Sequence, residues 1–446
     1  RAGAVTVSLD VWHLDVPEFL ECQTENGDQR RKAYDIFPQL VIPDEFMRRV
    51  SEGNGWTLVD PYEVRTKLGI ELAESWGDAF DSVYRQVELA AYDGKLTLTK
   101  TVVARDLFKE IMRRQVETGM PYLAFKDTIN RANPNKHSGY IPCTNLCTEA
   151  FGVVDFNHAY TCNLSSINLA NTAAEETPEI CETAVRLLDN AIDITVAPFA
   201  ASDRHNERYR TIGVGAMGLA DWLAARKLSY KNTGEISDLF EEIGYHCTRA
   251  SMELAKERGA YPAFEGSTWS RGDLIGAKPV EWYLKHTANA ARWLELSANI
   301  RLHGIRNSQI TAIAPNTSSS LVQGCTASVL PAYSRFFYDK WAKGVVPIAP
   351  PFIRDYFWHY SENKHVPQTT VVEAIATIQQ WIDTGISMEL LFNLNENAYG
   401  EGITLKAKDV FDTLLLAWRR GCKAVYYVRT VQKDAFKEEA CSACAN

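Results

Sequence analysis

Three groups of reactive side chains follow one another along the chain, and their types suit the transfer of electrons and hydrogen atoms. The first is the run NLCTE at 145–149, the second is Tyr426 with Tyr427, and the third is the run CSAC at 441–444. A thiol can exchange a hydrogen atom with a sugar carbon because the S–H and C–H bonds are close in strength. Paired phenols can pass an electron and a proton in steps, and a C-x-x-C pair can close and exchange a local disulfide. Together the three groups predict radical chemistry supplied with electrons by thiols.

The first group places an amide and a carboxylate two residues to either side of a thiol. Asn145, Cys147 and Glu149 point to one side if the segment is extended, because side chains alternate along an extended chain. A small substrate on that side would meet a hydrogen-bond donor, a hydrogen-atom abstractor and a base. A buried structural cysteine is the alternative for any lone thiol. We expect a loop between a strand and a helix here, since Pro142 and Gly152 bound the segment.

The phenol pair and the late thiols each have an alternative. Tyr426 and Tyr427 fall in a predicted buried strand at 422–428, where aromatic pairs usually fill the core. Alternation would send their rings to opposite faces, so only one ring can fill a given core. Cys441 and Cys444 could be half of a metal site or surface thiols, but the chain has no second C-x-x-C. We therefore favour a disulfide shuttle on a mobile tail.

A structural zinc site is a weaker alternative for the middle of the chain. Cys143, Cys147, His158 and Cys162 are ligand types that suit a tetrahedral zinc ion. The interval between them holds an apolar run and lacks the turn residues of a compact zinc knuckle. We expect no metal bound by this chain.

Two glycine- or serine-rich runs suggest ligand binding. Residues 213–218 form a G-x-G-x-x-G pattern, but RYR at 208–210 precedes it instead of a hydrophobic strand, so we expect glycines that pack a helix and not a dinucleotide site. The second run follows a strand-like segment, where N–H groups and hydroxyls at a helix N-terminus can bind phosphate; a plain helix cap is the equal alternative. The candidate phosphate-binding residues are Pro315, Asn316, Thr317, Ser318 and Ser319.

Apolar residues at helical spacing alternate with short apolar runs, which favours an α/β fold with helices outside a mostly parallel sheet. The clearest helix, at 102–118, stops at a Gly-Met-Pro signal. Loops are expected at 125–140 and 329–352, and a strand-like run begins at Val5. Further helices are predicted at 178–195, 235–257, 371–384 and 407–420, and strands at 138–142, 151–154, 309–314 and 422–428.

Composition and charge exclude several classes of protein. The 446 residues are 46% hydrophobic and 23% charged, which is typical of a globular chain with one large core or two to three domains. The net charge is −9 and the basic residues are spread out, which argues against a nucleic-acid polymer as partner. The sequence shows no membrane span or signal peptide. Ten irregularly spaced cysteines suit a reducing compartment, so we expect a cytoplasmic protein.

The order and joint presence of these groups resemble the large, catalytic subunit of a class I ribonucleotide reductase. The phenol pair favours class I, because class II enzymes generate the radical with adenosylcobalamin in the same chain and need no such pair. The resemblance runs over nearly the whole chain. The landmarks that carry it, besides the three groups above, are RAGA at 1–4, VWH at 11–13, TCNL at 161–164, RTIGVG at 210–215, HGIRNS at 303–308 and APNTSSS at 314–320.

The resemblance implies a fold and a domain organisation. The family has a ten-stranded α/β barrel of two five-stranded halves with a central finger loop, which here would carry Cys147. Residues 1–430 would form the C-terminal portion of that barrel without its first strands, and 431–446 would form the mobile tail. Arg1, Ala2 and Gly3 match the second half of the loop that reports effector identity to the substrate site. We therefore expect a fragment of a larger subunit.

The resemblance also implies a role for each matched residue. Cys147 would become the thiyl radical that takes the 3′-hydrogen of the substrate, Glu149 would accept the 3′-hydroxyl proton, and Asn145 would hold substrate oxygens. Cys162 would be one of two substrate-reducing thiols, with its partner thiol outside this chain. The remaining implied roles are radical transfer by Tyr426 and Tyr427, disulfide exchange by Cys441 and Cys444, and diphosphate binding by 315–319.

The implied activity is reduction of ribonucleoside diphosphates to deoxyribonucleotides. The radical would come from the metal centre of a separate small subunit, and ATP or deoxynucleoside triphosphates would act as effectors. The implied partners are the N-terminal portion of the large subunit, the small subunit, thioredoxin or glutaredoxin, and a second large subunit. The alternative from a different class is a half that folds and docks but does no chemistry by itself.

Overall fold

A four-stranded sheet joins the two ends of the chain in the computed structural model, which describes residues 3–341 and 344–431. β1 (Val5–Asp10), β2 (Ile36–Ile42) and β5 (Tyr122–Phe125) are parallel, and β11 (Ala424–Val425) is antiparallel to β5. Every residue of β5 is buried, as expected for a strand covered on both faces. The register pairs Val425 with Leu123. The residue that follows β11 therefore lies beside Tyr122.

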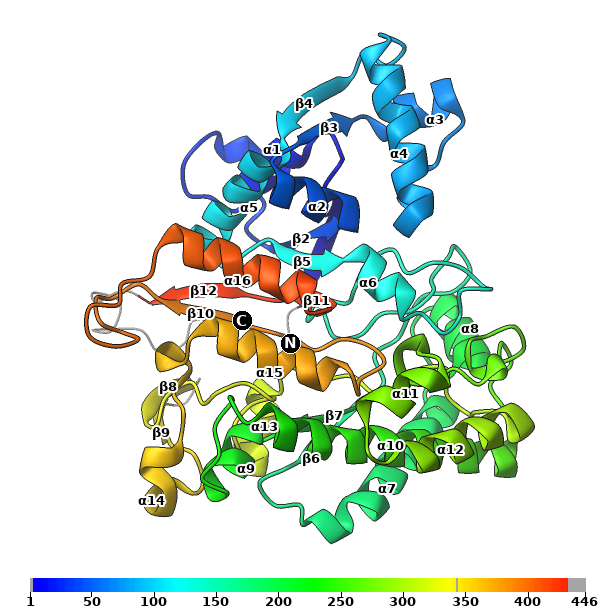
Figure 1. Cartoon of the computed structure of the whole chain (residues 1–446), viewed down its shortest axis with the longest axis vertical. Helices are drawn as coiled ribbons and strands as arrows, with labels where there is room; N and C mark the ends of the chain where they lie inside the picture. The colour runs from blue at the N-terminus through cyan, green and yellow to red at the C-terminus, as the bar shows by residue number, and fades with distance from the viewer. Residues whose placement is uncertain (1–2, 342–343, 432–446) are drawn as a thin grey trace.

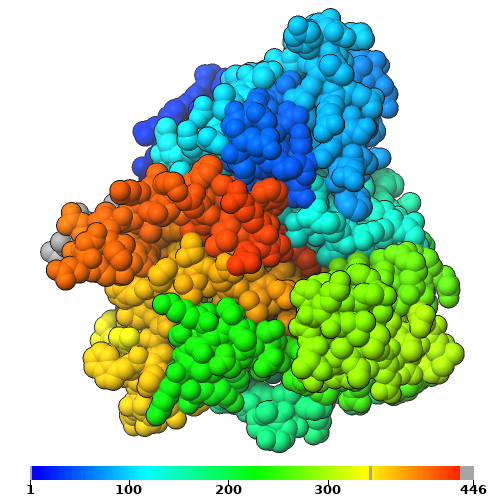
Figure 2. Space-filling view, in the orientation of Figure 1, coloured from blue at the N-terminus to red at the C-terminus, as the bar shows by residue number. Residues whose placement is uncertain are grey.

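The N-terminal part forms one end of the molecule, blue to cyan in Figures 1 and 2. Its antiparallel pair, β3 (Gly55–Val59) and β4 (Thr99–Val103), is covered by helices through buried aromatic rings. Trp56 stacks on Tyr84 at 4.4 Å between ring centroids and meets Phe46 edge-on at 5.0 Å, which fixes helix positions. The helices are α1 (Val16–Glu21), α2 (Asp44–Glu52), α3 (Pro61–Leu68), α4 (Gly77–Tyr92) and α5 (Ala104–Thr118).

The middle of the chain is built on the parallel pair β6 (Leu164–Asn168) and β7 (Gly213–Met217). Residues 309–313 extend beside β7 through the bridge between Val214 and Thr311, and Ile313 bridges to Ile386. The long helix α10 (Thr233–Arg258) packs along α7 (Thr177–Ile194). The other helices here are α6 (Lys126–Arg131), α8 (Ala200–Tyr209), α9 (Leu219–Ala225), α11 (Val280–His286), α12 (Ala290–His303) and α13 (Thr317–Gln323).

The C-terminal part returns to the centre of the molecule, where the orange and red segments lie against the blue end in Figure 2. β10 (Leu390–Asn393) and β12 (Val428–Val431) are parallel, with α15 (Gln368–Gln379) and α16 (Ala407–Arg419) beside them (Figure 1). An antiparallel pair, β8 (Phe337–Trp341) and β9 (Gly344–Ile348), and the short helix α14 (Ile353–Tyr356) precede α15.

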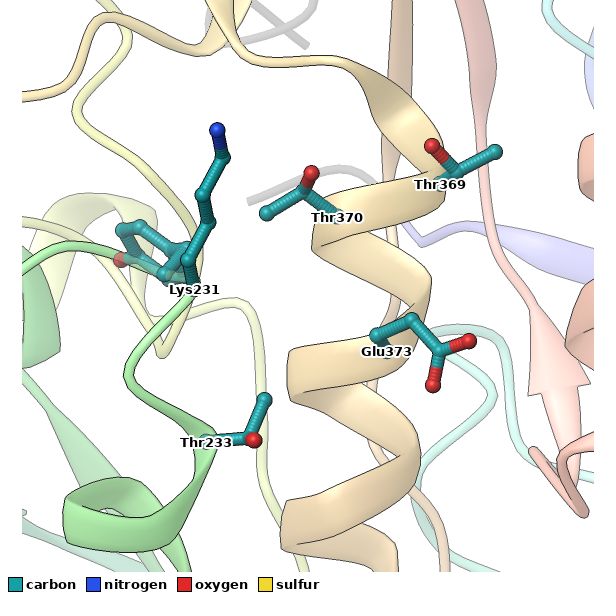
Figure 3. A pocket seen from close by; sticks show the side chains of 6 residues that line it. Lys231, Thr233, Thr369, Thr370 and Glu373 are labelled. Atoms are coloured by element: carbon teal, nitrogen blue, oxygen red, sulfur yellow. The ribbon is translucent and has the colours of Figure 1, made fainter.

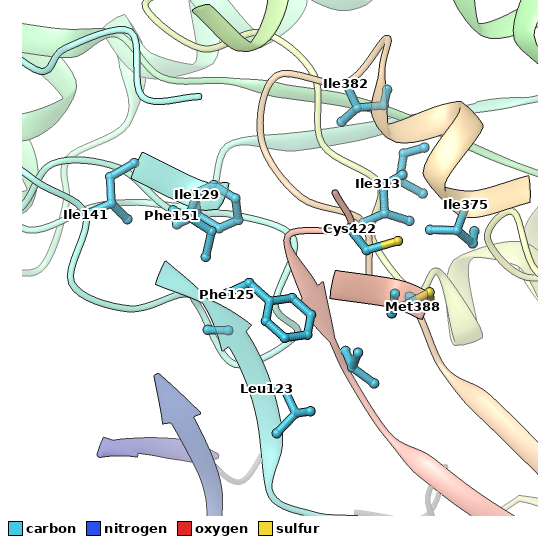
Figure 4. Close-up of a cluster of buried hydrophobic side chains, with 14 of the residues drawn as sticks. Leu123, Phe125, Ile129, Ile141, Phe151, Ile313, Ile375, Ile382, Met388 and Cys422 are labelled. Atoms are coloured by element: carbon cyan, nitrogen blue, oxygen red, sulfur yellow. The ribbon is translucent and has the colours of Figure 1, made fainter. Parts of the chain in front are cut away.

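A hydrophobic core ties these parts together. Residues from β5, from the segment around Ile313, from α15 and from the segment before β11 meet in one cluster (Figure 4). Phe125, Met388 and Cys422 are at most 1% exposed, so each has exchanged water for close packing, the main favourable term in folding. The core therefore brings together segments that are hundreds of residues apart in the sequence.

The structure confirms the predicted mixed α/β fold and most of the predicted helices. The helices at 102–118, 178–195, 235–257 and 407–420 correspond to α5, α7, α10 and α16 within a few residues. A closed ten-stranded barrel is not detected, since the described strands pair in one four-stranded and several two-stranded sheets. None of the helices in the described ranges is long and apolar enough to cross a membrane.

Several predicted elements were wrong, and their errors share a cause. No strand forms at 138–142 or 151–154, and the predicted strand at 422–428 is split into β11 and β12. The helix predicted at 371–384 ends at Gln379, and the predicted loops contain α6 and the β8–β9 pair. Short apolar runs mark burial, but burial alone does not distinguish a strand from an irregular buried segment.

The buried carboxylate of Asp127 links three helices, and we predict a large loss of stability when it is removed. Its oxygens accept the N–H of Asp44 at 2.7 Å and the N–H of Gly77 at 2.8 Å, the first residues of α2 and α4. Both N–H groups would lose their partner in Asp127→Ala, at a cost of about 2 to 4 kcal/mol. Denaturant unfolding measures this cost. The exposed Asp78, in the first turn of α4, is the control: Asp78→Ala should change stability by less than about 0.5 kcal/mol, and an equal effect of both variants would contradict the account.

Candidate active site

A thiol and a phenol from distant parts of the chain meet at the centre of the molecule. The Tyr426 hydroxyl donates toward Cys147 Sγ at 4.0 Å, although the two residues are 279 positions apart. Tyr426 follows β11 directly and is 8% exposed. Burial, and then the neighbouring Cys147 and Tyr427, raise the pKa of Tyr426, so its phenol stays protonated. The contact brings together two of the residues predicted from the sequence.

Tyr427 lies against Tyr426 and not on an opposite face, which corrects the alternation argument. Their ring centroids are 4.4 Å apart. The strand breaks between Val425 and Val428, because the Tyr426 N–H donates to Met388 O while the Val428 N–H donates to Gly119 O. The backbone thus changes partners between β11 and β12. Side chains therefore do not alternate between opposite faces across this break, and the two phenol rings lie next to each other.

A third phenol, Tyr122, completes this group and was not predicted. Its ring centroid lies 4.7 Å from that of Tyr426 and 5.0 Å from that of Tyr427. Burial and the two neighbouring phenols raise the pKa of Tyr122. In the sequence this residue begins the apolar run YLAF, which is typical of a core strand and gives no sign of a functional contact.

Cys147 lies on a tight turn instead of an extended segment. Thr148 has φ 69°, its N–H donates to Asn145 O at 3.2 Å, and the Asn145 N–H donates to Ala150 O at 2.8 Å. The Asn145 side chain accepts the Ala150 N–H at 3.1 Å. The predicted convergence of the side chains therefore arises from a turn, which the reasoning from period-two spacing did not foresee.

Glu149 is held beside the turn by a serine from a distant segment. The carboxylate is 2% exposed. The Ser387 hydroxyl donates to Glu149 Oε2 at 3.1 Å and to Cys147 O at 2.5 Å. Burial raises the pKa of Glu149, while hydrogen bonds from Asn145 and Ser387 oppose this rise. A carboxylate with a raised pKa and fixed geometry suits a general base. Ser387 was not predicted, because no reactive residue type stands near it in the sequence.

Gly385 allows this close approach. A Cβ at position 385 would lie 2.7 Å from Thr148 O and 3.0 Å from Glu149 Cα. The Gly385 N–H also donates to Glu149 O at 2.7 Å. Only a residue without a side chain fits between the two segments.

Cys162 joins the site through Asn145. The Asn145 amide donates to Cys162 Sγ at 3.5 Å. Cys162 is exposed as a residue, yet the protein atoms around its sulfur desolvate the thiolate, and this effect followed by the charge of Glu149 raises the pKa of the thiol. Asn145, Cys147, Glu149 and Cys162 therefore share one site, as the sequence predicted.

The alternative zinc site has no support from the geometry. The described ranges contain no group of three or more His, Cys, Asp or Glu side chains arranged to hold a metal ion. His158 instead faces Asp155, with Nδ1 2.9 Å from the carboxylate. Burial raises the pKa of Cys143, which Ser8 opposes, so this thiol faces β1.

The first two glycines of the G-x-G-x-x-G pattern, Gly213 and Gly215, lie in β7, and the third, Gly218, follows the strand and precedes α9. A Cβ on Gly215 would lie 2.3 Å from Ala312 O, and one on Gly213 would lie 2.4 Å from a Leu164 methyl group. The glycines let β7 approach residues 309–313 and β6 closely. The expectation that these glycines pack a helix was wrong for Gly213 and Gly215, whose neighbours are extended segments.

The predicted phosphate segment begins the short helix α13. Asn316 has φ 56° and its side chain makes no cap; its amide donates instead to Ser166 Oγ at 2.9 Å. The Asn316 side chain therefore does not cap helix α13. Thr317, Ser318 and Ser319 are exposed at the start of the helix, and their hydroxyls are accessible to a ligand.

The other predicted residues are not among those that the structure places in the site. Cys441 and Cys444, with the rest of the predicted tail from 432 on, fall outside the described residues, as do Arg1 and Ala2. Gly3 is exposed and lies just before β1. A cavity of about 480 Å³ between the starts of α10 and α15 is lined by Lys231, Thr370 and Glu373 among others (Figure 3). None of the predicted site residues lines it.

The fold and site define a mixed α/β protein in which a buried phenol group, a thiol on a turn and a carboxylate converge. Comparison with known proteins agrees with this class. The family model described as the barrel domain of ribonucleotide reductase matches residues 1–359 and 345–428. The chain belongs to this family.

Relatives from several bacteria support the assignment. The chain is 66% identical to the ribonucleoside-diphosphate reductase subunit alpha of Synechocystis sp., over all of this chain and 59% of that protein. It is 33% identical to the subunit alpha of Helicobacter pylori, over 96% of this chain and 61% of that protein. It is 32% identical to that of Treponema pallidum, over all of this chain and 54% of that protein. The chain thus spans somewhat more than half the length of these relatives.

The raised pKa of Cys162 predicts slow alkylation at neutral pH. The thiolate is the reactive form, so modification of Cys162 by iodoacetamide should accelerate only at a higher pH than for a free cysteine of pKa about 8.5. Glu149→Gln removes a negative charge and should shift this acceleration to lower pH. Peptide mass spectrometry across a pH series measures the rate. An unchanged profile in Glu149→Gln would show that the carboxylate does not act on Cys162.

Proposed function

We propose that this chain carries the thiyl-radical site of a class I ribonucleoside-diphosphate reductase large subunit. The observation that supports this most strongly is the 4.0 Å contact between the Tyr426 hydroxyl and Cys147 Sγ, within a site where Ser387 joins Cys147 to Glu149. The pair offers a direct route for a hydrogen atom from the thiol to an oxidised phenol. Membership of the ribonucleotide reductase family supplies the reaction class.

Each step uses a side chain of the site. A radical from the metal centre of a small subunit passes through Tyr427 to Tyr426, which takes the hydrogen atom of the Cys147 thiol. The Cys147 thiyl radical then takes the 3′-hydrogen of a ribonucleoside diphosphate while Glu149 accepts the 3′-hydroxyl proton and Asn145 holds substrate oxygens. The 2′-hydroxyl leaves as water while Cys162 and a second thiol close to a disulfide, and Cys147 returns the hydrogen atom.

The proposal extends to the parts of the enzyme beyond this site. Residues 1–430 form part of the ten-stranded barrel domain, and residues 431–446 form the tail in which Cys441 and Cys444 exchange disulfides with thioredoxin or glutaredoxin. Pro315, Asn316, Thr317, Ser318 and Ser319 bind the diphosphate, and Arg1, Ala2 and Gly3 belong to the loop that reports nucleotide effectors. A polypeptide for the part of the relatives that this chain does not span supplies the partner of Cys162, and two large subunits pair.

Reduction of CDP tests this proposal. The chain is mixed with a class I small subunit, with and without a polypeptide for the uncovered part of the Synechocystis relative. Activity only in the complete mixture is expected, because one of the two reducing thiols is lacking without it. Activity without the added polypeptide would contradict the inference that the thiol partner of Cys162 lies outside this chain. Inactivity of both mixtures would favour a half that folds and docks but does no chemistry.

We predict that Cys147→Ser and Tyr427→Phe each abolish this activity with any reductant. Serine cannot give up a hydrogen atom as readily as a thiol, and phenylalanine has no hydroxyl to oxidise. Deoxycytidine diphosphate formation with dithiothreitol measures the loss. Cys143→Ser is the matched control and should retain activity within about threefold, because that thiol faces β1 and not the site. Retained turnover in Tyr427→Phe would exclude a radical path through the pair.

Loss of a tail thiol should stop turnover with a protein reductant but not with dithiothreitol. Cys441→Ser cannot form the C-x-x-C disulfide, so turnover with thioredoxin is expected to stop after the first cycle. Dithiothreitol can reduce the active-site disulfide directly, and activity with it should match that of the unmodified chain. Equal loss with both reductants would refute the shuttle role.

A further inference from the structure

Residues 382–388, here called the bridging segment, contact both the thiol and the phenol of the site. On one side, the Ser387 hydroxyl donates to Cys147 O at 2.5 Å and to the Glu149 carboxylate at 3.1 Å. On the other side, Met388 O accepts the Tyr426 N–H at 2.9 Å. The separation of Cys147 and Tyr426 therefore depends on where this segment lies.

A buried lysine fastens the start of the bridging segment. Lys423 is 4% exposed, and its Nζ donates to the carbonyl oxygens of Ile382 at 3.2 Å, Asp383 at 2.6 Å and Thr384 at 2.7 Å. An ammonium group has three N–H donors, so these carbonyls use all of them. Burial lowers the pKa of Lys423, and the nearby Asp383 carboxylate opposes this change.

The Asp383 side chain fastens the bridging segment to the neighbouring extended chain. Its carboxylate is 2% exposed and accepts the N–H groups of Ile310 at 2.7 Å and Thr311 at 2.8 Å. The Ile313 N–H donates to Gly385 O at 3.0 Å, and the Ser387 N–H donates to Ile313 O at 2.9 Å. The segment is thus held on two sides by buried groups.

We propose that Lys423 and Ser387 are positioning residues that set the separation between the Cys147 thiol and the Tyr426 hydroxyl, an inference that rests on the proposed function. Lys423 stands three residues before Tyr426, so one short stretch of backbone carries both the anchor and the phenol. Ser387 then transmits the position of the bridging segment to the turn of Cys147. Neither residue needs to contact the substrate for this role.

Lys423→Met tests the anchor. Methionine keeps much of the volume but removes all three donors, so three buried carbonyls lose their partner and the segment is expected to shift. Misplacement of reacting atoms by about 1 Å can cost about a hundredfold in rate. We expect kcat for CDP reduction to fall about 10- to 100-fold with KM unchanged, since only a step after binding is affected.

The pH dependence of kcat/KM in Ser387→Ala tests the contact between Ser387 and the turn of Cys147. Because the Ser387 hydroxyl stabilises the Glu149 carboxylate, its loss should raise the pKa of Glu149 further. The acidic limb of kcat/KM should then move to higher pH. The other polar or titratable groups that act on or near Glu149 are Asn145, Cys162 and Tyr160, and they remain in place in this variant.

Hydrogen exchange of the full chain provides a measurement that does not need activity. Lys423→Met should speed exchange in peptides that cover 383–388 and 426, because the Gly385 N–H donates to Glu149 O and the Tyr426 N–H donates to Met388 O. Exchange should also speed at 145–150, because this turn loses its support when the bridging segment shifts, and β3 should be unchanged. Lys278→Met is the matched control. Lys278 donates to Gln380 O, just outside the segment, and lies 4.2 Å from the Trp282 ring centroid, so its loss should leave kcat within about twofold.

The outcomes separate the two proposals. Local loosening at 145–150 together with a fall in kcat at constant KM in Lys423→Met, and a shifted acidic limb in Ser387→Ala, would support the positioning role. Unchanged exchange at 145–150 in Lys423→Met, or a kcat equal to that of Lys278→Met, would overturn it. An unmodified chain that is inactive in the complete mixture would contradict the proposed function, and the exchange measurement would still decide whether Lys423 holds the turn.

Discussion

The structure depends on one contact, the approach of a phenol hydroxyl to a thiol across 279 residues of sequence. In the proposed function a hydrogen atom passes between these two groups, and the rate of such a transfer falls steeply with distance. Both side chains must therefore be held in fixed positions. The fold meets this requirement by pairing β11, at the edge of the four-stranded sheet, with the fully buried β5 and by placing Cys147 on a turn fixed by its own hydrogen bonds.

Close packing of backbone against backbone makes this arrangement possible. Gly385 lets the bridging segment touch the Cys147 turn, and Gly215 lets β7 touch residues 309–313. A methyl group at either position would overlap with backbone atoms, and well-packed interiors yield little to such overlap. Buried charged groups, Asp383 and Lys423, then satisfy backbone N–H and carbonyl groups that the irregular segments leave unpaired.

The sequence predicted which reactive side chains lie close together better than it predicted the elements that hold them. Cys147, Glu149, Asn145 and Tyr426 were chosen from residue type and order, because few side chains suit the predicted radical chemistry, and the structure places them close together. Long amphipathic helices such as α5 and α10 were found from their period. The turn at Thr148 and the break between β11 and β12 were missed, since both depend on partners far away in the sequence. For the same reason Tyr122 and Ser387 could not be recognised, because each acquires its role only when the chain is folded.

The central claim is that Tyr426 delivers the oxidising equivalent to Cys147. The most direct measurement replaces Tyr426 with 3-aminotyrosine, which is easier to oxidise than tyrosine, and records electron paramagnetic resonance after mixing with the small subunit, the uncovered portion and CDP. The account predicts an aminotyrosyl radical at position 426 that does not form when Tyr427 is changed to phenylalanine. Absence of that radical while the mixture still reduces CDP would contradict it.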